Sequence, residues 1–190
     1  MGAIFEPEAL DAIVRPIAVD DNRSLDDKFD AITEALAERW PGHIDTGPRR
    51  WIFNNAGGAM GQMCLLHASL TEYLIFFGTP IGTEGHSGRY ATDVWDFMID
   101  GECQVYVEGE LERTSAVAGG PYLHLGADRA KGYRIPDHGW MLEYARGPIP
   151  TMLPFGLADT LVSTLDWTTL RRTLVDYGRL VTREILRGKI

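Results

Sequence analysis

The sequence predicts an α+β protein in which helices at both ends of the chain flank an antiparallel β-barrel or sandwich. Apolar residues recur at helical spacing before residue 42 and after residue 150. Between residues 50 and 146, short runs rich in aromatic and aliphatic residues alternate with glycine clusters, which is typical of strands and turns. Since no repeat or low-complexity linker interrupts this order, we expect a single domain over 1–190, with entry helices in 1–42, a β-barrel in 50–146 and C-terminal helices in 150–188.

The N-terminal region predicts two helices. Pro7 suits a helix start, and the apolar residues behind it keep helical spacing as far as Pro16, where we expect this helix to break. Ser24 and Asp27 have the spacing of a capping box, in which the two side chains satisfy free backbone N–H groups at the start of a helix. An amphipathic helix should follow and end at the Pro-Gly pair of residues 41–42, with an apolar face made of Leu25, Phe29, Ile32, Leu36 and Trp40.

The central region predicts strands and the last forty residues predict helices. In "ECQVYVEG", Cys103, Val105 and Val107 alternate with polar or amphipathic residues, as in a strand with one buried face. After Pro150 a stripe recurs every three or four residues, and we expect it to pack on the barrel. Its members are Leu170, Leu174, Tyr177, Val181 and Ile185.

Charge and cysteine content exclude several classes of protein. The net charge of −9 makes nucleic-acid binding improbable, and we expect no such partner. Cys64 and Cys103 form neither a disulfide framework nor a C-x-x-C pair, which favours a reducing compartment. The sequence has no signal-peptide pattern and no apolar run long enough for a membrane span. We therefore expect a cytoplasmic or peripheral membrane protein.

Two acids in apolar strands are the main candidates for chemistry. Asp96 shares a strand face with Val94 and Met98, and Glu143 shares one with Met141 and Ala145. If both faces point into a barrel, burial and mutual repulsion disfavour ionisation, so the pair tends to hold one proton. That arrangement supplies an acid and a base in one cavity. The alternative is that each acid points to solvent or caps a turn.

The remaining candidates are less specific. Glu72 is a third acid in an apolar run, and a structural role as an acceptor of backbone N–H bonds is as plausible as a catalytic one. A His-x-His metal motif is absent at His86, while His67 and His124 stand alone in the sequence. The sequence also contains neither a G-x-S-x-G nucleophile motif nor a G-x-G-x-x-G or Walker motif for nucleotides. We expect no metal and no cofactor.

Two long segments carry a resemblance to a known family. "NNAGGAMGQMCLLHASLTEYLIFFGTPIGTEGHSGRY" resembles the signature region of the sigma-1 receptor and fungal C-8 sterol isomerase family, and "WMLEYARGPIPTMLPFGLADTLVSTLDWTTL" is similar to its C-terminal part. The resemblance runs from about Phe5 to Leu186. It implies a cupin-like β-barrel with an interior ligand cavity, C-terminal helices that cover the barrel mouth and face a membrane, and a homotrimer.

The resemblance also implies roles for particular residues. The two ligand-contacting carboxylates of the family fall on Asp96 and Glu143, and its barrel-wall acid falls on Glu72. The residues that match the family's cavity lining are Met63, Leu65, Tyr73, Phe77 and Trp140, with His124 matching a histidine near the cavity.

Two departures from the family pattern bear on function. Eukaryotic members begin with a membrane-spanning helix, whereas this chain starts at the first soluble helix, and Ala59 replaces a family tryptophan beside the cavity region. The resemblance implies an enzyme of lipid metabolism that shifts a ring double bond of a sterol or related polycyclic lipid. The alternative is a non-catalytic, receptor-like protein that binds hydrophobic amines or lipids in the same barrel.

Overall fold

The computed structural model describes residues 2–189, so Met1 and Ile190 of the expected range 1–190 lie outside the described part. Within residues 2–189 the chain forms four α-helices, a short 3-10 turn and nine strands. The helices are α1 (Pro7–Ala18), α2 (Leu25–Arg39), α3 (Leu153–Val162) and α4 (Trp167–Leu186), and the turn is η1 (Ile149–Thr151). The strands are β1 (Ile52–Ala56), β2 (Ala59–Ala68), β3 (Glu72–Thr79), β4 (Thr83–His86), β5 (Asp93–Val107), β6 (Thr114–Val117), β7 (Leu123–Leu125), β8 (Lys131–Ile135) and β9 (Gly139–Arg146).

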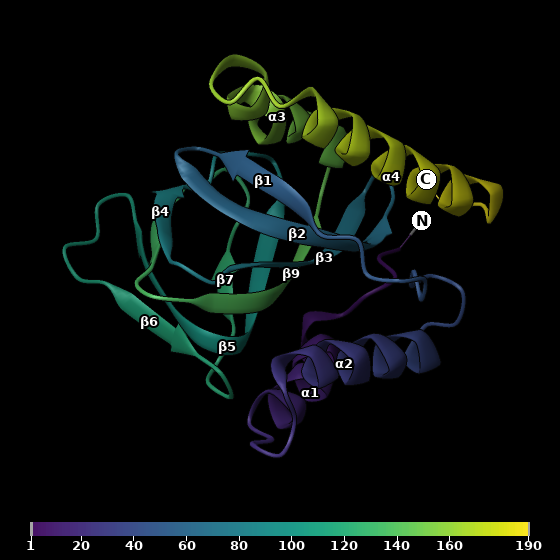
Figure 1. Cartoon of the computed structure of the whole chain (residues 1–190), viewed down its shortest axis with the longest axis horizontal. Coiled ribbons are helices and arrows are strands. Elements are labelled where there is room, and N and C mark those ends of the chain that lie inside the picture. Colours follow the sequence, from purple (N-terminus) through teal and green to yellow (C-terminus); the bar gives the residue numbers. More distant parts are fainter. Residues whose placement is uncertain (1, 190) are drawn as a thin grey trace.

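The strands form one antiparallel sheet that curls into a nearly closed barrel. Their hydrogen-bonded order is β1-β2-β3-β9-β5-β8-β4, and β6 and β7 also pair with β5. At the two ends of this path, the His86 N–H on β4 donates to the Gly57 carbonyl in the β1–β2 turn at 2.9 Å. The Met60 N–H on β2 donates to the hydroxyl of Thr83 on β4 at 2.8 Å. The barrel prediction is therefore confirmed, and Figure 1 shows the strands curling between two pairs of helices.

Small residues permit this closure. A Cβ atom on Gly85 of β4 would lie only 2.6 Å from the backbone nitrogen and 2.8 Å from the Cβ of Ala59. Ala59 is itself buried. The alanine that replaces the family tryptophan thus belongs to the contact that closes the barrel between β2 and β4.

Strands β3 and β9 are apolar on both faces because both faces are covered. Along β9, Trp140, Leu142 and Tyr144 pack outside the barrel in one hydrophobic cluster with residues of α1 and α2. Met141 lies in a separate cluster inside the barrel, and Ala145 in a third beneath the C-terminal segment. Continuous apolar runs are expected for strands buried in this way.

The N-terminal helices follow the sequence prediction with one difference. Ser24 and Asp27 form the predicted capping box at the start of α2. The expected break at Pro16 is wrong, because α1 continues through Pro16 to Ala18. Pro16 lies in the last turn of the helix, so its missing N–H group costs one hydrogen bond and only two residues of the helix follow it.

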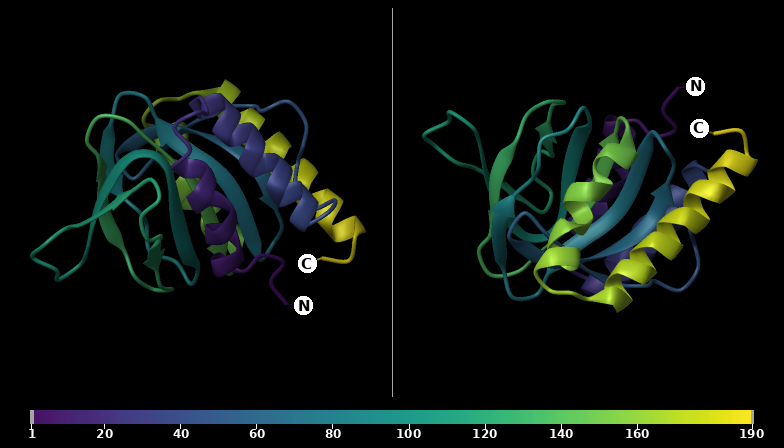
Figure 2. Two further views of the ribbon diagram at one scale, coloured as in Figure 1. Left: turned by 90° about the horizontal axis from the view of Figure 1, so that it is seen from below. Right: turned by 90° about the horizontal axis from the view of Figure 1, so that it is seen from above.

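The C-terminal helices lie together across one end of the barrel, as Figure 1 and the right view of Figure 2 show. The stripe predicted for α4 packs only in part, since Tyr177 and Val181 contact the barrel and other members do not. Leu174 and Ile185 remain 46% and 47% exposed, although Val181 is buried. The buried residues of α4 are mostly polar, and they are Thr169, Thr173, Asp176, Leu180, Val181 and Glu184.

Charged contacts explain why part of the apolar stripe of α4 stays exposed. Asp176 accepts a hydrogen bond from the Arg50 guanidinium at 2.9 Å, and Arg179 pairs with Asp45. The helix therefore docks through ion pairs, which leaves part of its apolar side uncovered. In the described part of the chain, no helix combines the length and apolar character that a membrane span requires.

Candidate functional site

The barrel encloses a cavity of about 190 Å³ whose walls are mostly apolar. Residues of α3 and Tyr177 of α4 close it at one end, together with Met152. Four of the residues that the sequence comparison assigned to the cavity line it, namely Met63, Leu65, Tyr73 and Phe77. The interior also contains Asp96 and Glu143, so the barrel brings the two candidate acids together.

Asp96 and Glu143 are direct neighbours across two strands. They face each other in the antiparallel register of β5 and β9, and both side chains point inward. Residues opposite each other in such a ladder have Cβ atoms about 4.5–5.5 Å apart. Asp96 is 2% exposed, and the accessible surface of Glu143 lies on the cavity that it lines. The solvent-facing alternative for these acids does not match this geometry.

The surroundings of Glu143 favour its protonated form. Burial raises the pKa of Glu143, the Asp96 charge raises it further, and the result is a pKa of about 7. A hydrogen bond from the Tyr73 hydroxyl and the positive charge of Lys131 act in the opposite direction. Burial and the nearby Glu143 carboxylate also raise the pKa of Tyr73 well above its usual range, so Tyr73 stays a hydrogen-bond donor.

Lys131 is a third ionisable group in the cavity, and the sequence analysis missed it. Its ammonium group forms a buried ion pair with one oxygen of Asp96. Burial alone would lower the pKa of Lys131, but the Asp96 carboxylate outweighs burial and raises it. Strand alternation could have predicted that Lys131 faces the cavity, because Lys131, Tyr133 and Ile135 share one face of β8.

Trp140 and His124 lie outside the cavity. Trp140 packs against the rings of Phe29 and Trp51 on the outer face of the sheet. The ring of His124 stacks on Trp95 with centroids 4.8 Å apart, and its Nε2 lies 2.9 Å from a carboxylate oxygen of Asp93. The residues next to Trp140 on β9 and next to His124 on β7 face into the barrel instead.

Glu72 lies on the outer face of β3 and connects both ends of the chain. Its carboxylate accepts hydrogen bonds from the Ile4 N–H and the Tyr144 hydroxyl, each at 2.9 Å. It also pairs with Lys189 at 2.6 Å. Burial acts to raise the pKa of Glu72, but these three partners outweigh burial and lower it. The geometry corresponds to the structural role considered for this acid.

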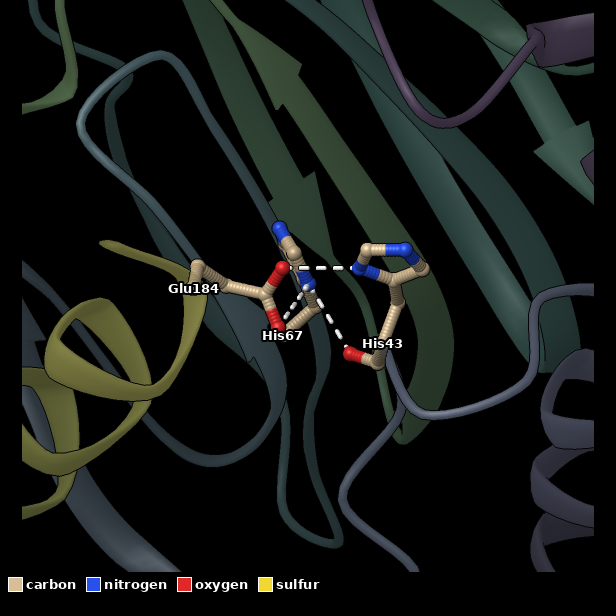
Figure 3. Close-up of side chains that lie close together, drawn as sticks. All are labelled: His43, His67 and Glu184. Carbon is tan, nitrogen blue, oxygen red and sulfur yellow. Dashed lines mark hydrogen bonds and ion pairs between the residues drawn. The ribbon is translucent and has the colours of Figure 1, made fainter. Parts of the chain in front are cut away.

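A second buried cluster, formed by His43, His67 and Glu184, lies where α4 meets the barrel (Figure 3). The Nδ1 of His43 lies 2.7 Å from Glu184, and the Nδ1 of His67 lies 2.9 Å from the His43 carbonyl. Although these types of residue can bind metals, two guanidinium groups already approach Glu184, from Arg183 at 3.5 Å and Arg187 at 3.8 Å. Through His43, these contacts join α4 to the segment that precedes β1.

The fold and cavity define a class of small-molecule-binding barrel with a buried carboxyl pair. The profile of the family described as "ERG2 and Sigma1 receptor like protein" matches residues 2–189. The chain belongs to this family. The resemblance noted in the sequence is thereby confirmed.

Several curated relatives support this assignment. A C-8 sterol isomerase from Neurospora crassa is 53% identical over 139 residues, which covers 73% of this chain and 54% of that protein. The C-8 sterol isomerase erg2 of Aspergillus fumigatus is 44% identical and covers 98% of this chain and 77% of its own length. A sigma non-opioid intracellular receptor 1 from Taricha granulosa is 45% identical, with coverages of 82% and 70%.

Solved cupin structures are more distant. An RmlC-like cupin from Shewanella frigidimarina has 19% sequence identity and a TM-score of 0.46, and the match covers 56% of this chain and 90% of that one.

Replacing Glu143 with glutamine should change how stability depends on pH. Because the folded state raises the pKa of Glu143 from 4.5 to about 7, it binds this proton more tightly than the unfolded state does. The free energy of unfolding should therefore fall as pH rises from 4.5 to 7, by on the order of 2 to 3 kcal/mol from this group. Urea unfolding at pH 5 and pH 8 measures the fall, which Glu143→Gln should remove. Equal falls in both proteins would contradict the assignment.

Proposed function

We propose that this protein is a C-8 sterol isomerase-like enzyme that moves a ring double bond of a sterol or related polycyclic lipid from Δ8 to Δ7. The observation that carries the proposal is the neighbouring Asp96–Glu143 pair in an apolar cavity, where the pKa of Glu143 is about 7. The names of the fungal relatives support the same reaction. No cofactor is needed for a proton shift of this kind.

The proposed reaction is acid–base catalysis by the two carboxyl groups. A protonated carboxyl group donates a proton to one alkene carbon, and a tertiary carbocation forms at the other. Loss of a proton from the adjacent carbon then leaves the double bond shifted by one position. A carboxylate in this low-dielectric site stabilises the cation much more strongly than water would.

The cavity size suggests how such a substrate enters. Sites for drug-sized molecules usually enclose about 300–1,000 Å³, whereas this cavity measures about 190 Å³. We infer that α3 and α4 shift outward to admit a four-ring lipid. These helices line the cavity without being hydrogen-bonded into the sheet, so we infer that they are the movable part of its wall.

The exposed side of the same helices supports a proposed attachment to a membrane surface. Val162, Trp167 and Leu186 are 78%, 65% and 83% exposed, and further exposed apolar side chains gather on the same segment, namely Leu161, Leu165, Leu174, Val175 and Ile185. Arg171 and Arg172 are exposed on the same helix. Basic and apolar residues together suit a helix lying on anionic lipid. Four other basic residues near the C-terminus instead pair with acidic side chains of the protein. They are Arg179, Arg183, Arg187 and Lys189.

The alternative function is non-catalytic binding of hydrophobic amines or lipids in the same cavity. Relatives named sigma non-opioid intracellular receptor 1 support it. An ammonium ligand would be attracted by the carboxyl pair, in which one oxygen of Asp96 is paired with Lys131 and the other is free. Family membership also supports a homotrimer, which light scattering would report as three times the 21.1 kDa chain. A monomeric mass would contradict the trimer.

Isomerase activity is tested with a Δ8-sterol in detergent and product analysis by gas chromatography and mass spectrometry. The wild-type protein should form the Δ7 product, and Asp96→Asn and Glu143→Gln should each lower kcat by at least about 100-fold. Glu38→Gln, at an exposed position on α2, is the matched control and should keep full activity. Full activity in both amide variants would refute the mechanism, and saturable binding without turnover would favour the receptor-like alternative.

Membrane attachment is tested by co-sedimentation with vesicles of phosphatidylserine and phosphatidylcholine at low salt. The wild-type protein should sediment, and Val162→Ser combined with Trp167→Ala should reduce the bound fraction severalfold because apolar contact is lost. Leu111→Ala, at a fully exposed position before β6, should not change the bound fraction. A wild-type protein that stays in the supernatant would argue against the attachment.

A further inference from the structure

We propose that Lys131 gives the two carboxyl groups different roles, by holding Asp96 as the standing carboxylate and leaving the proton on Glu143. Lys131 is then a positioning residue of the site. This inference rests on the proposed isomerase function for its catalytic meaning, but the division of charge that it describes can be measured without turnover.

Lys131 reaches the acids from another part of the barrel wall. Asp96 lies in the first half of β5, opposite Glu143 of β9. Lys131 belongs to β8, and its backbone is opposite Val107 at the far end of β5. The ion pair therefore crosses the interior between two parts of the bent sheet. A surface ion pair would be worth little, but a buried one fixes which carboxyl group is charged.

The two oxygens of Asp96 have different surroundings. One accepts the bond from Lys131, and the other is buried without a hydrogen-bond partner among the described residues. An unpartnered carboxylate oxygen in an apolar cavity is costly unless something uses it. It provides a fixed negative site for a cation or for a proton that leaves the substrate.

Glu143 has the opposite environment. One of its oxygens accepts a hydrogen bond from Tyr73, and the Asp96 charge opposite disfavours a second carboxylate. The proton of the pair therefore stays on Glu143. The two acids thus differ in protonation because only Asp96 has a cationic partner within hydrogen-bond distance.

The roles give a balanced proton cycle. The Glu143 carboxyl group forms the new C–H bond with the alkene and becomes a carboxylate. The free Asp96 oxygen takes the proton whose C–H electrons form the shifted double bond. Asp96 and Glu143 face each other across the ladder, so this proton returns to Glu143 over a short path, and the enzyme ends in its starting state.

The other ionisable groups facing the cavity do not mimic this titration. Burial raises the pKa of the four tyrosines and the thiol, the latter to about 12, so these groups stay neutral below pH 9. They are Tyr73, Tyr90, Tyr133, Tyr177 and Cys103. His86 also lines the cavity, so a His86→Gln variant is needed as a control.

The first test follows the Glu143 carboxyl group by carbon-13 NMR, assigned by its loss in Glu143→Gln. In the wild-type protein it should titrate near pH 7. In Lys131→Met its midpoint should rise by about 1 to 3 pH units, because a nearby positive charge that favoured the carboxylate is gone. Lys131→Arg and His86→Gln should keep the wild-type midpoint. A near-neutral signal that disappears in Asp96→Asn but persists in Glu143→Gln would overturn the proposal.

The second test uses N,N-dimethyldecahydroquinolinium, a bicyclic cation with a permanent charge. Lys131→Met should bind this probe at pH 6 more tightly than the wild-type protein does, by on the order of tenfold, since Glu143 is protonated in both proteins and one like charge has left the cavity. Unchanged or weaker binding would contradict the proposal. If Lys131→Met does not fold, the double variant Asp96→Asn/Lys131→Met removes both charges, and Glu143 should then titrate below its wild-type midpoint.

The third test measures turnover and distinguishes the isomerase proposal from the proposed role of Lys131. In an active enzyme, the alkaline fall of kcat/KM should move to higher pH in Lys131→Met and stay in place in Lys131→Arg. A purely structural lysine would lower activity at every pH without moving this fall. If the wild-type protein proves inactive, the isomerase proposal fails, whereas the NMR and probe-binding results still decide the role of Lys131.

Discussion

The structure depends on how three ionisable groups are held away from water inside one barrel. An unpaired charge in an apolar interior costs several kcal/mol, so each group must be paired or neutral. Asp96 forms an ion pair with Lys131, which comes from another part of the barrel wall. Glu143 becomes neutral by binding a proton. A flat open sheet would not bring β8 to Asp96. Closure of the barrel is therefore a requirement of the site as well as of the fold.

Strands β3 and β9 show how environment sets the chemistry of one residue type. On the inner face, the Tyr73 hydroxyl donates to Glu143, and on the outer face the Tyr144 hydroxyl donates to Glu72. The outer acid also has Lys189 and backbone N–H groups, which lower its pKa, whereas the inner acid faces Asp96 and its pKa rises. The same tyrosine–carboxyl bond is thus structural on one face and part of the proton-sharing pair on the other.

Local patterns in the sequence predicted the barrel, the capping box and the inward faces of both acids, because strand alternation and cap spacing are short-range properties. The family resemblance implied a cavity position for Trp140. Strand alternation conflicts with that position, since Met141 and Glu143 face inward and Trp140 therefore faces outward. Lys131 could not be paired with Asp96 from sequence, because that contact joins strands that meet only when the sheet curls. The buried face of α4 was predicted only in part for a similar reason, since Tyr177 and Val181 of the stripe pack while charged partners distant in the sequence hold the other buried positions.

The charged docking of α4 connects the closed cavity to its proposed substrate. Apolar packing on the barrel would have buried Leu174 and Ile185, and moving the helix would then expose that surface to water at a cost of about 25 cal/mol per Å². Instead, α4 is attached partly through ion pairs such as Arg179–Asp45, and partly exposed pairs of this kind contribute only about 0–1 kcal/mol each. Water can replace these partners when the helix shifts. We therefore propose that the polar attachment lets the wall open at low cost and leaves apolar residues free to contact the lipid from which a sterol would enter.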